Sequence, residues 1–245
     1  MRENDAETFG KAVEPANQRR RSVWAVVVTG IAFAVLFLAS MFTLSRIPGP
    51  RASDAALETF YASDQRRLVV LTGLYLLPFA AVAFLWFMAV LRDWESNSVR
   101  RLSRVLSNVQ LLSGIAFITL ILASAGATVV TAFANEFSGV QVEPILARQF
   151  PLYGSALLYV FAMRMAAIFV TSTTGLVRAA GMFPVWFLVV SYVVAAFLFL
   201  AATLSVWLVL VFPAWIIVVC AMIALRVPLD PPVAGKETAD DPLAA

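Results

Sequence analysis

The sequence predicts an all-α integral membrane protein built as a bundle of six transmembrane helices. The 245-residue chain is 61% hydrophobic and only 13% charged, whereas a soluble domain carries about 25% charged residues. Its mean hydropathy is +0.86. The apolar residues gather into six runs of about 20 residues or more, the length that crosses a hydrocarbon layer of roughly 30 Å.

The runs follow one another along the chain with short polar connections. The first run is about 22 residues long, too long for the apolar region of a signal peptide, and predicts a retained helix. The stretch from Met182 to Leu225 carries no charge and would measure about 66 Å as one helix, so it predicts two helices with a turn near Ala201–Ser205. The six predicted spans are Val23–Leu44, Leu68–Leu91, Val109–Ala132, Leu152–Val177, Met182–Ala202 and Thr203–Leu225.

Three regions follow from this pattern: a disordered cytoplasmic tail over residues 1–22, a membrane domain over 23–226, and a second disordered cytoplasmic tail over 227–245. Basic residues favour the cytoplasmic side of a membrane. Twelve Lys and Arg residues lie on the side of the termini, and five lie on the other side: Arg46, Arg51, Arg66, Arg67 and Arg148. Together with a composition rich in Arg over Lys, this predicts a bacterial plasma membrane protein with both termini cytoplasmic.

Missing residue types exclude several kinds of site. The chain has no histidine and a single cysteine, Cys220, which excludes His-ligated haem or zinc, a His proton relay and an internal disulfide. No predicted span holds Asp, Glu or Lys in its core, so a retinal-type Schiff base, an intramembrane carboxylate pump and an aspartyl protease are not expected. We therefore predict no cofactor, no metal site and no nucleic-acid partner.

Arg164 lies midway along the fourth predicted span. A central Arg costs about 2.5 to 3.5 kcal/mol on insertion scales, so it requires compensating contacts. At 100° per residue, Arg164 shares a stripe with Tyr153, Thr171 and Arg178, which we expect to face the bundle interior or a water-filled cavity. We take these four residues as a candidate ligand-binding set for an anionic lipid or solute.

A structural role for Arg164 is the alternative, in which the guanidinium locks helix packing. Its candidate acceptors are hydroxyl groups, backbone carbonyls freed at a kink, Gln110, Glu136 and a bound anion. Pro78 and Pro213 lie near the middle of the second and sixth spans and predict helix kinks. In the first outer loop, Ser53 is placed to cap a short helix that carries Leu57, Phe60 and Tyr61.

The last two predicted helices share short apolar motifs. Pro184 and Trp186 open one, and the other contains Phe212-Pro213-Ala214-Trp215. Over Met182 to Leu225 this arrangement resembles one group of uncharacterised bacterial multi-pass membrane proteins, a domain of unknown function. The resemblance implies a membrane bundle and supplies no catalytic residue.

These observations favour a non-enzymatic membrane protein, a subunit or scaffold of a membrane complex with a protein partner. The alternative is a carrier or channel for an anionic or amphipathic solute that uses Arg164. An intramembrane enzyme would need a catalytic pair drawn from the outer-loop carboxylates, which lack motif spacing: Asp54, Glu58, Asp64, Glu136 and Glu143.

Overall fold

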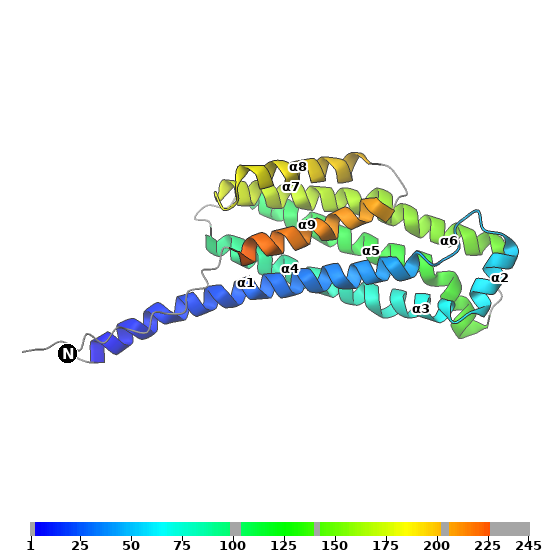
Figure 1. Cartoon of the computed structure of the whole chain (residues 1–245), viewed down its shortest axis with the longest axis horizontal. Coiled ribbons are helices and arrows are strands. Elements are labelled where there is room, and N and C mark those ends of the chain that lie inside the picture. The colour runs from blue at the N-terminus through cyan, green and yellow to red at the C-terminus, as the bar shows by residue number, and fades with distance from the viewer. Residues whose placement is uncertain (1–2, 99–103, 140–142, 202–205, 226–245) are drawn as a thin grey trace, which may run out of the picture.

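The computed structural model describes residues 3–98, 104–139, 143–201 and 206–225, and these are helical along most of their length. The helices form one elongated bundle (Figure 1). Four helical stretches are long and apolar enough to cross a membrane: Arg21–Leu44, Gln65–Glu95, Arg104–Ser138 and Pro144–Ala179. The described part of the chain is therefore of the all-α class, with segments suited to a bilayer.

Helix α1 (Glu3–Leu44) runs along the bundle and extends beyond it at the N-terminal end (Figure 1). The predicted disordered tail over residues 1–22 is therefore helical from Glu3 onward. An existing helix grows at the cost of fixing one residue per added hydrogen bond, so the apolar part of α1 supplies the nucleus for this extension. The second predicted tail, 227–245, lies outside the described residues.

The connection after α1 contains the short helix α2 (Asp54–Ala62). Ser53 caps it, because its hydroxyl oxygen accepts a hydrogen bond from the Ala56 amide at 3.3 Å. Leu57 and Phe60 are buried on the inner face of α2. The cap and the short helix predicted from the sequence are confirmed.

The second span is continuous but irregular. It consists of α3 (Gln65–Leu71), the π-helical segment η1 (Thr72–Leu76) and α4 (Leu77–Ser98). Pro78 lies two residues after the end of η1, where its missing amide hydrogen and its ring disturb regular α-helical bonding. By contrast, α9 (Val206–Ala224) is helical on both sides of Pro213.

The third and fourth spans form the middle of the bundle. Helix α5 (Arg104–Ser138) is followed by α6 (Pro144–Ala156), the π-helical segment η2 (Leu157–Ala162) and α7 (Met163–Ala179). Gly181 ends α7 with a φ of +63°, a conformation that glycine adopts without strain. The Gly181 amide bonds the Arg178 carbonyl and the Met182 amide bonds the Val177 carbonyl, the two bonds of a Schellman motif.

The uncharged stretch divides into α8 (Val185–Leu200) and α9, as predicted. Pro184 has extended backbone angles and precedes the first helical residue of α8, which leaves this helix 16 residues long. At 1.5 Å per residue, α8 is about 24 Å long. It is therefore shorter than its predicted span, and residues 202–205 of the predicted turn lie outside the described part.

Five helices each contribute one phenylalanine to the centre of the core. The Phe84 ring centroid of α4 lies 4.9 Å from that of Phe33 in α1, 5.2 Å from Phe117 in α5 and 5.2 Å from Phe169 in α7. Phe212 of α9 closes the cluster at 4.7 Å from Phe117. Tilted and edge-on aromatic pairs add to the packing of buried rings, so this cluster fixes α1, α4, α5, α7 and α9 against one another.

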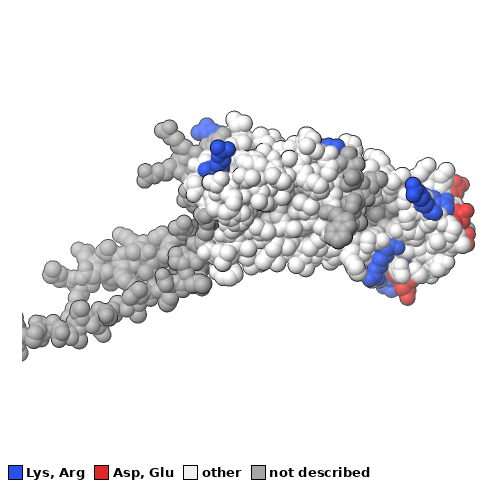
Figure 2. Space-filling view, turned by 45° about the horizontal axis from the view of Figure 1, so that its top comes forward, with Lys and Arg blue, Asp and Glu red and all other residues white. Residues whose placement is uncertain are grey.

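Charged side chains gather at the ends of the bundle. The face shown in Figure 2 is largely uncharged along its length, and its acidic residues lie at the end where α2 and α6 meet. Two ion pairs form there, Arg66 with Glu136 and Arg148 with Asp54. We call this region the outer end, and the opposite end, where α4 stops and α5 begins, the inner end.

Candidate functional site: a hydroxyl-lined cleft at the outer end

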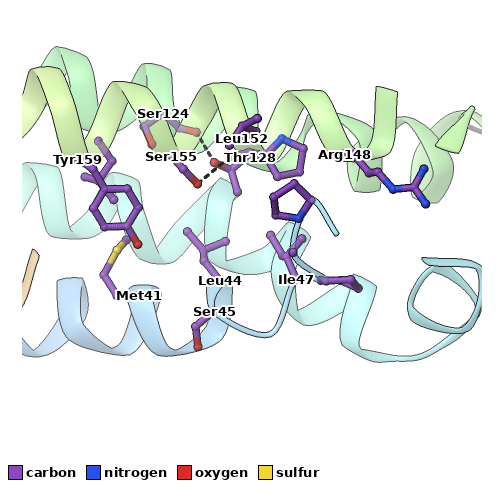
Figure 3. Close-up of a pocket in the computed structure, with 15 residues that line it drawn as sticks. Met41, Leu44, Ser45, Ile47, Ser124, Thr128, Arg148, Leu152, Ser155 and Tyr159 are labelled. Carbon is purple, nitrogen blue, oxygen red and sulfur yellow. Dashed lines mark hydrogen bonds between the residues drawn. The ribbon is translucent and has the colours of Figure 1, made fainter. Parts of the chain in front are cut away.

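A cleft of about 190 Å³ opens between the end of α1, the connection that follows it, and helices α5 and α6 (Figure 3). Apolar side chains from α1 and the fourth span form one part of its wall, and hydroxyl groups form another. Its lining residues are Met41, Leu44, Ser45, Ile47, Pro48, Gly49, Pro50, Ser124, Thr128, Arg148, Pro151, Leu152, Ser155, Leu158 and Tyr159.

Close contact between α5 and α6 shapes the floor of the cleft. A side chain at Gly154 would place its Cβ atom in overlap with Thr128 Oγ1 and 2.8 Å from the Ser124 carbonyl oxygen. The absence of a side chain therefore lets the two helices touch. The Ser124 hydroxyl donates to the Gly154 carbonyl at 2.6 Å, which joins the helices directly.

The irregular backbone of the fourth span also contributes. Pro151 lies inside α6, and η2 begins at Leu157, only a few residues further along. A π-helical turn holds more residues than an α-helical turn and is frequent at functional sites. Ser155, between these two features, donates its hydroxyl hydrogen to the Pro151 carbonyl at 2.8 Å.

The hydroxyl groups of the cleft are oriented by backbone carbonyls. Ser124, Ser155 and Thr128 each donate to a carbonyl oxygen, the last to Ser124 at 2.7 Å. A hydroxyl has one hydrogen and two lone pairs, so these three groups have lone pairs left to offer. These three hydroxyl groups are therefore available as acceptors for a ligand in the cleft.

Arg148 lies at the rim, and its guanidinium points away from the apolar part of the cleft (Figure 3). Its Nη2 atom donates to the Ala52 carbonyl at 2.9 Å and pairs with the Asp54 carboxylate. An Arg whose charge is matched by a carboxylate offers little net attraction to a further anion. The rim is thus close to neutral.

The predicted stripe does not line this cleft. Tyr153, Thr171 and Arg178 are exposed on the surface of the bundle, and Arg164 is half-buried. The bundle interior, one of the two surroundings expected for this stripe, is therefore wrong for Tyr153, Thr171 and Arg178. Thr171 instead lines an open groove between α5, α7 and α8. Segment η2 separates Tyr153 from Arg164, so counting 100° per residue across it misplaces Tyr153.

Arg164 itself bonds within its own helix, because its Nη1 atom donates to the Val160 carbonyl of η2. Two other side chains considered as acceptors for it make contacts elsewhere: Glu136 pairs with Arg66, and Gln110 donates its amide hydrogens to Glu95 and Thr173. The buried face of α7 centres on Val170 and includes Thr173 and Thr174. Arg164 lies about 120° away from that centre at the helical period.

A buried carboxyl group at the inner end was not anticipated. Glu95 near the end of α4 is only 1% exposed and accepts a hydrogen bond from Gln110. Its spacing was a usable signal, since Phe84, Met88, Leu91 and Glu95 follow one another at helical intervals on the buried side. The apolar run stops at Leu91, so the pattern of apolar spans alone does not single out Glu95.

Among the described residues, no three His, Cys, Asp or Glu side chains gather as metal ligands would. Cys220 is buried in α9 and forms no disulfide. Comparison with protein-family models, with curated proteins and with solved structures finds no match to this chain. The site must therefore be interpreted from its own geometry.

Proposed function

We propose that this chain is a six-helix integral protein of a bacterial plasma membrane, with α8 and α9 as the fifth and sixth spans and both termini cytoplasmic. The uncharged sequence of α8 and α9 supports this proposal, as does the excess of basic residues on the side of the termini. A short span is accommodated by local thinning of the bilayer, at a modest cost per ångström.

Within that membrane, we propose a non-enzymatic subunit that holds a small neutral amphiphile in the outer cleft. The observation that carries this proposal is the cleft itself, which combines an apolar wall with oriented hydroxyl groups. Small-molecule sites are typically concave and mostly apolar, with a few placed polar groups. A single apolar tail with a hydroxyl-bearing head matches both parts of the lining.

The hydrogen-bond pattern selects the head group. The three hydroxyl groups of Ser124, Thr128 and Ser155 already donate their hydrogens to carbonyl oxygens. They therefore favour a ligand that donates hydrogen bonds. The charge of Arg148 is matched by Asp54. A glycerol-like or sugar-like head is therefore preferred over a carboxylate or phosphate.

Ligand retention in native mass spectrometry tests this proposal. Purified wild type is stripped of lipid in detergent and offered monooctanoylglycerol, with octanoate as the anion of equal chain length. We expect one monooctanoylglycerol per chain and weaker retention of octanoate. Preferential retention of octanoate, or retention of neither, would contradict the neutral-ligand site.

Two substitutions localise the binding. Ser155→Leu fills the cleft and should abolish retention. Thr119→Leu is the matched control, because Thr119 is an exposed helical residue whose hydroxyl also donates to the carbonyl four residues earlier. Equal loss in both variants would show that the ligand lies elsewhere.

A second candidate is the scaffold function, in which the chain pairs with another membrane protein. It is favoured by a groove of about 460 Å³ between α5, α7 and α8, open at the lateral surface. Tyr192, Thr171 and Ser172 line it beside apolar residues such as Phe199. A stoichiometric partner that co-purifies with wild type and is lost in Ala196→Trp would support this function, whereas an unaccompanied monodisperse chain would oppose it.

A further inference from the structure

Three helices meet around a buried polar cluster at the inner end of the bundle. Glu95 of α4 is 1% exposed, Gln110 of α5 is 0% exposed and Thr173 of α7 is 2% exposed. The Gln110 Nε2 atom donates to Glu95 Oε1 at 3.2 Å and to Thr173 Oγ1 at 2.9 Å. Gln110 thereby joins the three helices through one amide group.

Two oxygen atoms of this cluster have no partner. Glu95 Oε2 and Gln110 Oε1 are the buried side-chain polar atoms without a hydrogen bond in the described part of the chain. Both hydrogens of the Gln110 amide nitrogen are already used. The two unpartnered atoms belong to the two groups that already share a hydrogen bond, and both of them are acceptors.

An unpartnered buried acceptor costs about 1 to 3 kcal/mol, and a buried carboxylate costs more unless it is paired. A single hydrogen on Glu95 Oε2 removes both deficits, because it gives Gln110 Oε1 a donor and leaves the carboxyl group neutral. A carboxylic acid and a primary amide then share two hydrogen bonds in one plane. One bond is the contact already present between Gln110 Nε2 and Glu95 Oε1.

We propose that Glu95 and Gln110 form a proton-binding site that joins α4 to α5 and, through Thr173, to α7. The bound proton resides on Glu95 Oε2 and is shared with Gln110 Oε1. This site is independent of the outer cleft and of any ligand bound there. It gives the bundle a titratable contact at its inner end.

Among the described side chains, no cation pairs directly with Glu95. Arg92, one turn earlier on α4, acts on Glu95 electrostatically, but its guanidinium bonds the Ser107 hydroxyl of α5 at 3.0 Å. The groups facing Glu95 from α5 and α7 are the neutral Gln110 and Thr173. The other described charged side chains of this end are exposed: Arg21, Asp93, Arg104 and Arg178.

A proton fits the cluster better than a metal cation does. Hard cations such as Ca²⁺ and Mg²⁺ take about six or more oxygen ligands. Here the side chains leave two oxygens free, which is the number that one shared proton satisfies. A sodium ion would be attracted to the same two oxygen atoms, so sodium binding is the competing outcome of the test.

Infrared difference spectroscopy tests the site directly, using wild type against Glu95→Gln at neutral pH. The substituted amide keeps the shape of the neutral acid and presents its own hydrogens to Gln110 Oε1, so the variant is expected to fold. We expect the carbonyl band of a protonated carboxyl group in wild type and its loss in the variant. Carboxylate bands alone in the difference spectrum would overturn the proposal.

Thermal unfolding in detergent from mildly acidic to alkaline pH gives a second readout. The folded cluster binds its proton more tightly than the unfolded chain, so the stabilisation by this site is complete at low pH, where both states are protonated. It declines from the pH at which the unfolded carboxyl group ionises until the folded site has also released its proton. Glu95→Gln should lack this loss, and Glu58→Gln, which alters an exposed carboxyl group, should keep it. A wild-type profile matching that of Glu95→Gln, or alkaline stability restored by sodium and not by potassium, would overturn the proton site.

Discussion

Arg66 of α3 and Glu136 of α5 form an ion pair at the outer end, with Arg66 Nη2 2.7 Å from Glu136 Oε2. The same guanidinium donates to Asn135 Oδ1 at 2.7 Å and to the Tyr61 carbonyl. Arg66 thus ties the outer connection to the end of α5. This contact gives a structural role to one of the five arginines that the sequence predicts on the side opposite the termini.

Replacing Arg66 should loosen this end of the bundle. Arg66→Gln removes the charge-assisted bonds and leaves Glu136 without its cation, so we expect a loss of about 2 kcal/mol in the free energy of unfolding. Chemical unfolding in mixed micelles measures it. Arg67→Gln, at an exposed neighbouring position, is the control and should stay within about 0.5 kcal/mol of wild type; equal losses in the two variants would contradict the specific role of Arg66.

Gly154 should tolerate no side chain. Gly154→Ala places a Cβ atom 2.8 Å from the Ser124 carbonyl oxygen, a backbone atom that moves only with its helix. We expect α5 and α6 to separate slightly, with a loss of about 1 to 3 kcal/mol. Gly126→Ala is matched in chemistry but meets no atom within 4 Å, so the same unfolding measurement should show a neutral or slightly stabilising change.

Trp215 of α9 links the two last helices, because its indole nitrogen donates to the Ser191 hydroxyl of α8 at 3.0 Å. Trp215→Phe leaves the buried Ser191 oxygen without that donor and should cost about 1 kcal/mol beyond the lost packing. A double-mutant cycle with Ser191→Ala isolates the bond. Strictly additive single-variant losses would show that the hydrogen bond contributes nothing.

Tyr61 should make the outer end sensitive to alkaline pH. Burial raises the pKa of its phenol above the ordinary value, against a smaller lowering by its hydrogen bond with Thr131. The neutral phenol is thus favoured in the folded state. Its stabilisation is complete below the unfolded pKa of about 10 and is lost as the pH rises through the higher folded pKa. Unfolding of Tyr61→Phe should lose this alkaline component, and an unchanged profile would contradict it.

Arg164 should be dispensable for stability and for retention of the neutral ligand. Its guanidinium bonds a carbonyl of its own helix, so Arg164→Leu removes a costly charge without orphaning a distant partner, and we expect a neutral or stabilising change. Native mass spectrometry of Arg164→Gln beside wild type separates the two roles of this residue. If wild type carries a bound anion that Arg164→Gln lacks, this result would support the anionic site predicted from the sequence.

The outer-end cap illustrates what local sequence can predict. Ser53 precedes a short amphipathic segment, and a hydroxyl at that position bonds the free amides of the first turn wherever the helix docks. Similarly, the division between Leu200 and Val206 follows from length alone, because one uncharged helix through both segments would be twice the membrane thickness. Both predictions depend on residues close together in the chain.

The surroundings of Glu95 could not be predicted from the residues near it in the chain. Its neighbours in sequence suggest a carboxylate beyond the end of a span, but its environment is set by Gln110 and Thr173, which lie on two other helices. The outer cleft likewise requires α1, α5 and α6 to meet, and the contact at Gly154 depends on the partner helix. The residue pattern within one helix does not predict these contacts between helices.

The sequence by itself indicated the all-helical class and segments suited to a membrane, since a backbone in lipid must bond internally and long apolar runs can do so only as helices. Tertiary structure decided which side of each helix is buried. It placed Arg164 at the flank of α7, because the small and apolar residues around Val170 pack more closely and leave the long guanidinium to bond η2. The rotation of a helix about its own axis depends on its packing against the whole bundle. The π-helical turn at η2 changes the rotation of the fourth span, and amino-acid composition does not predict that change.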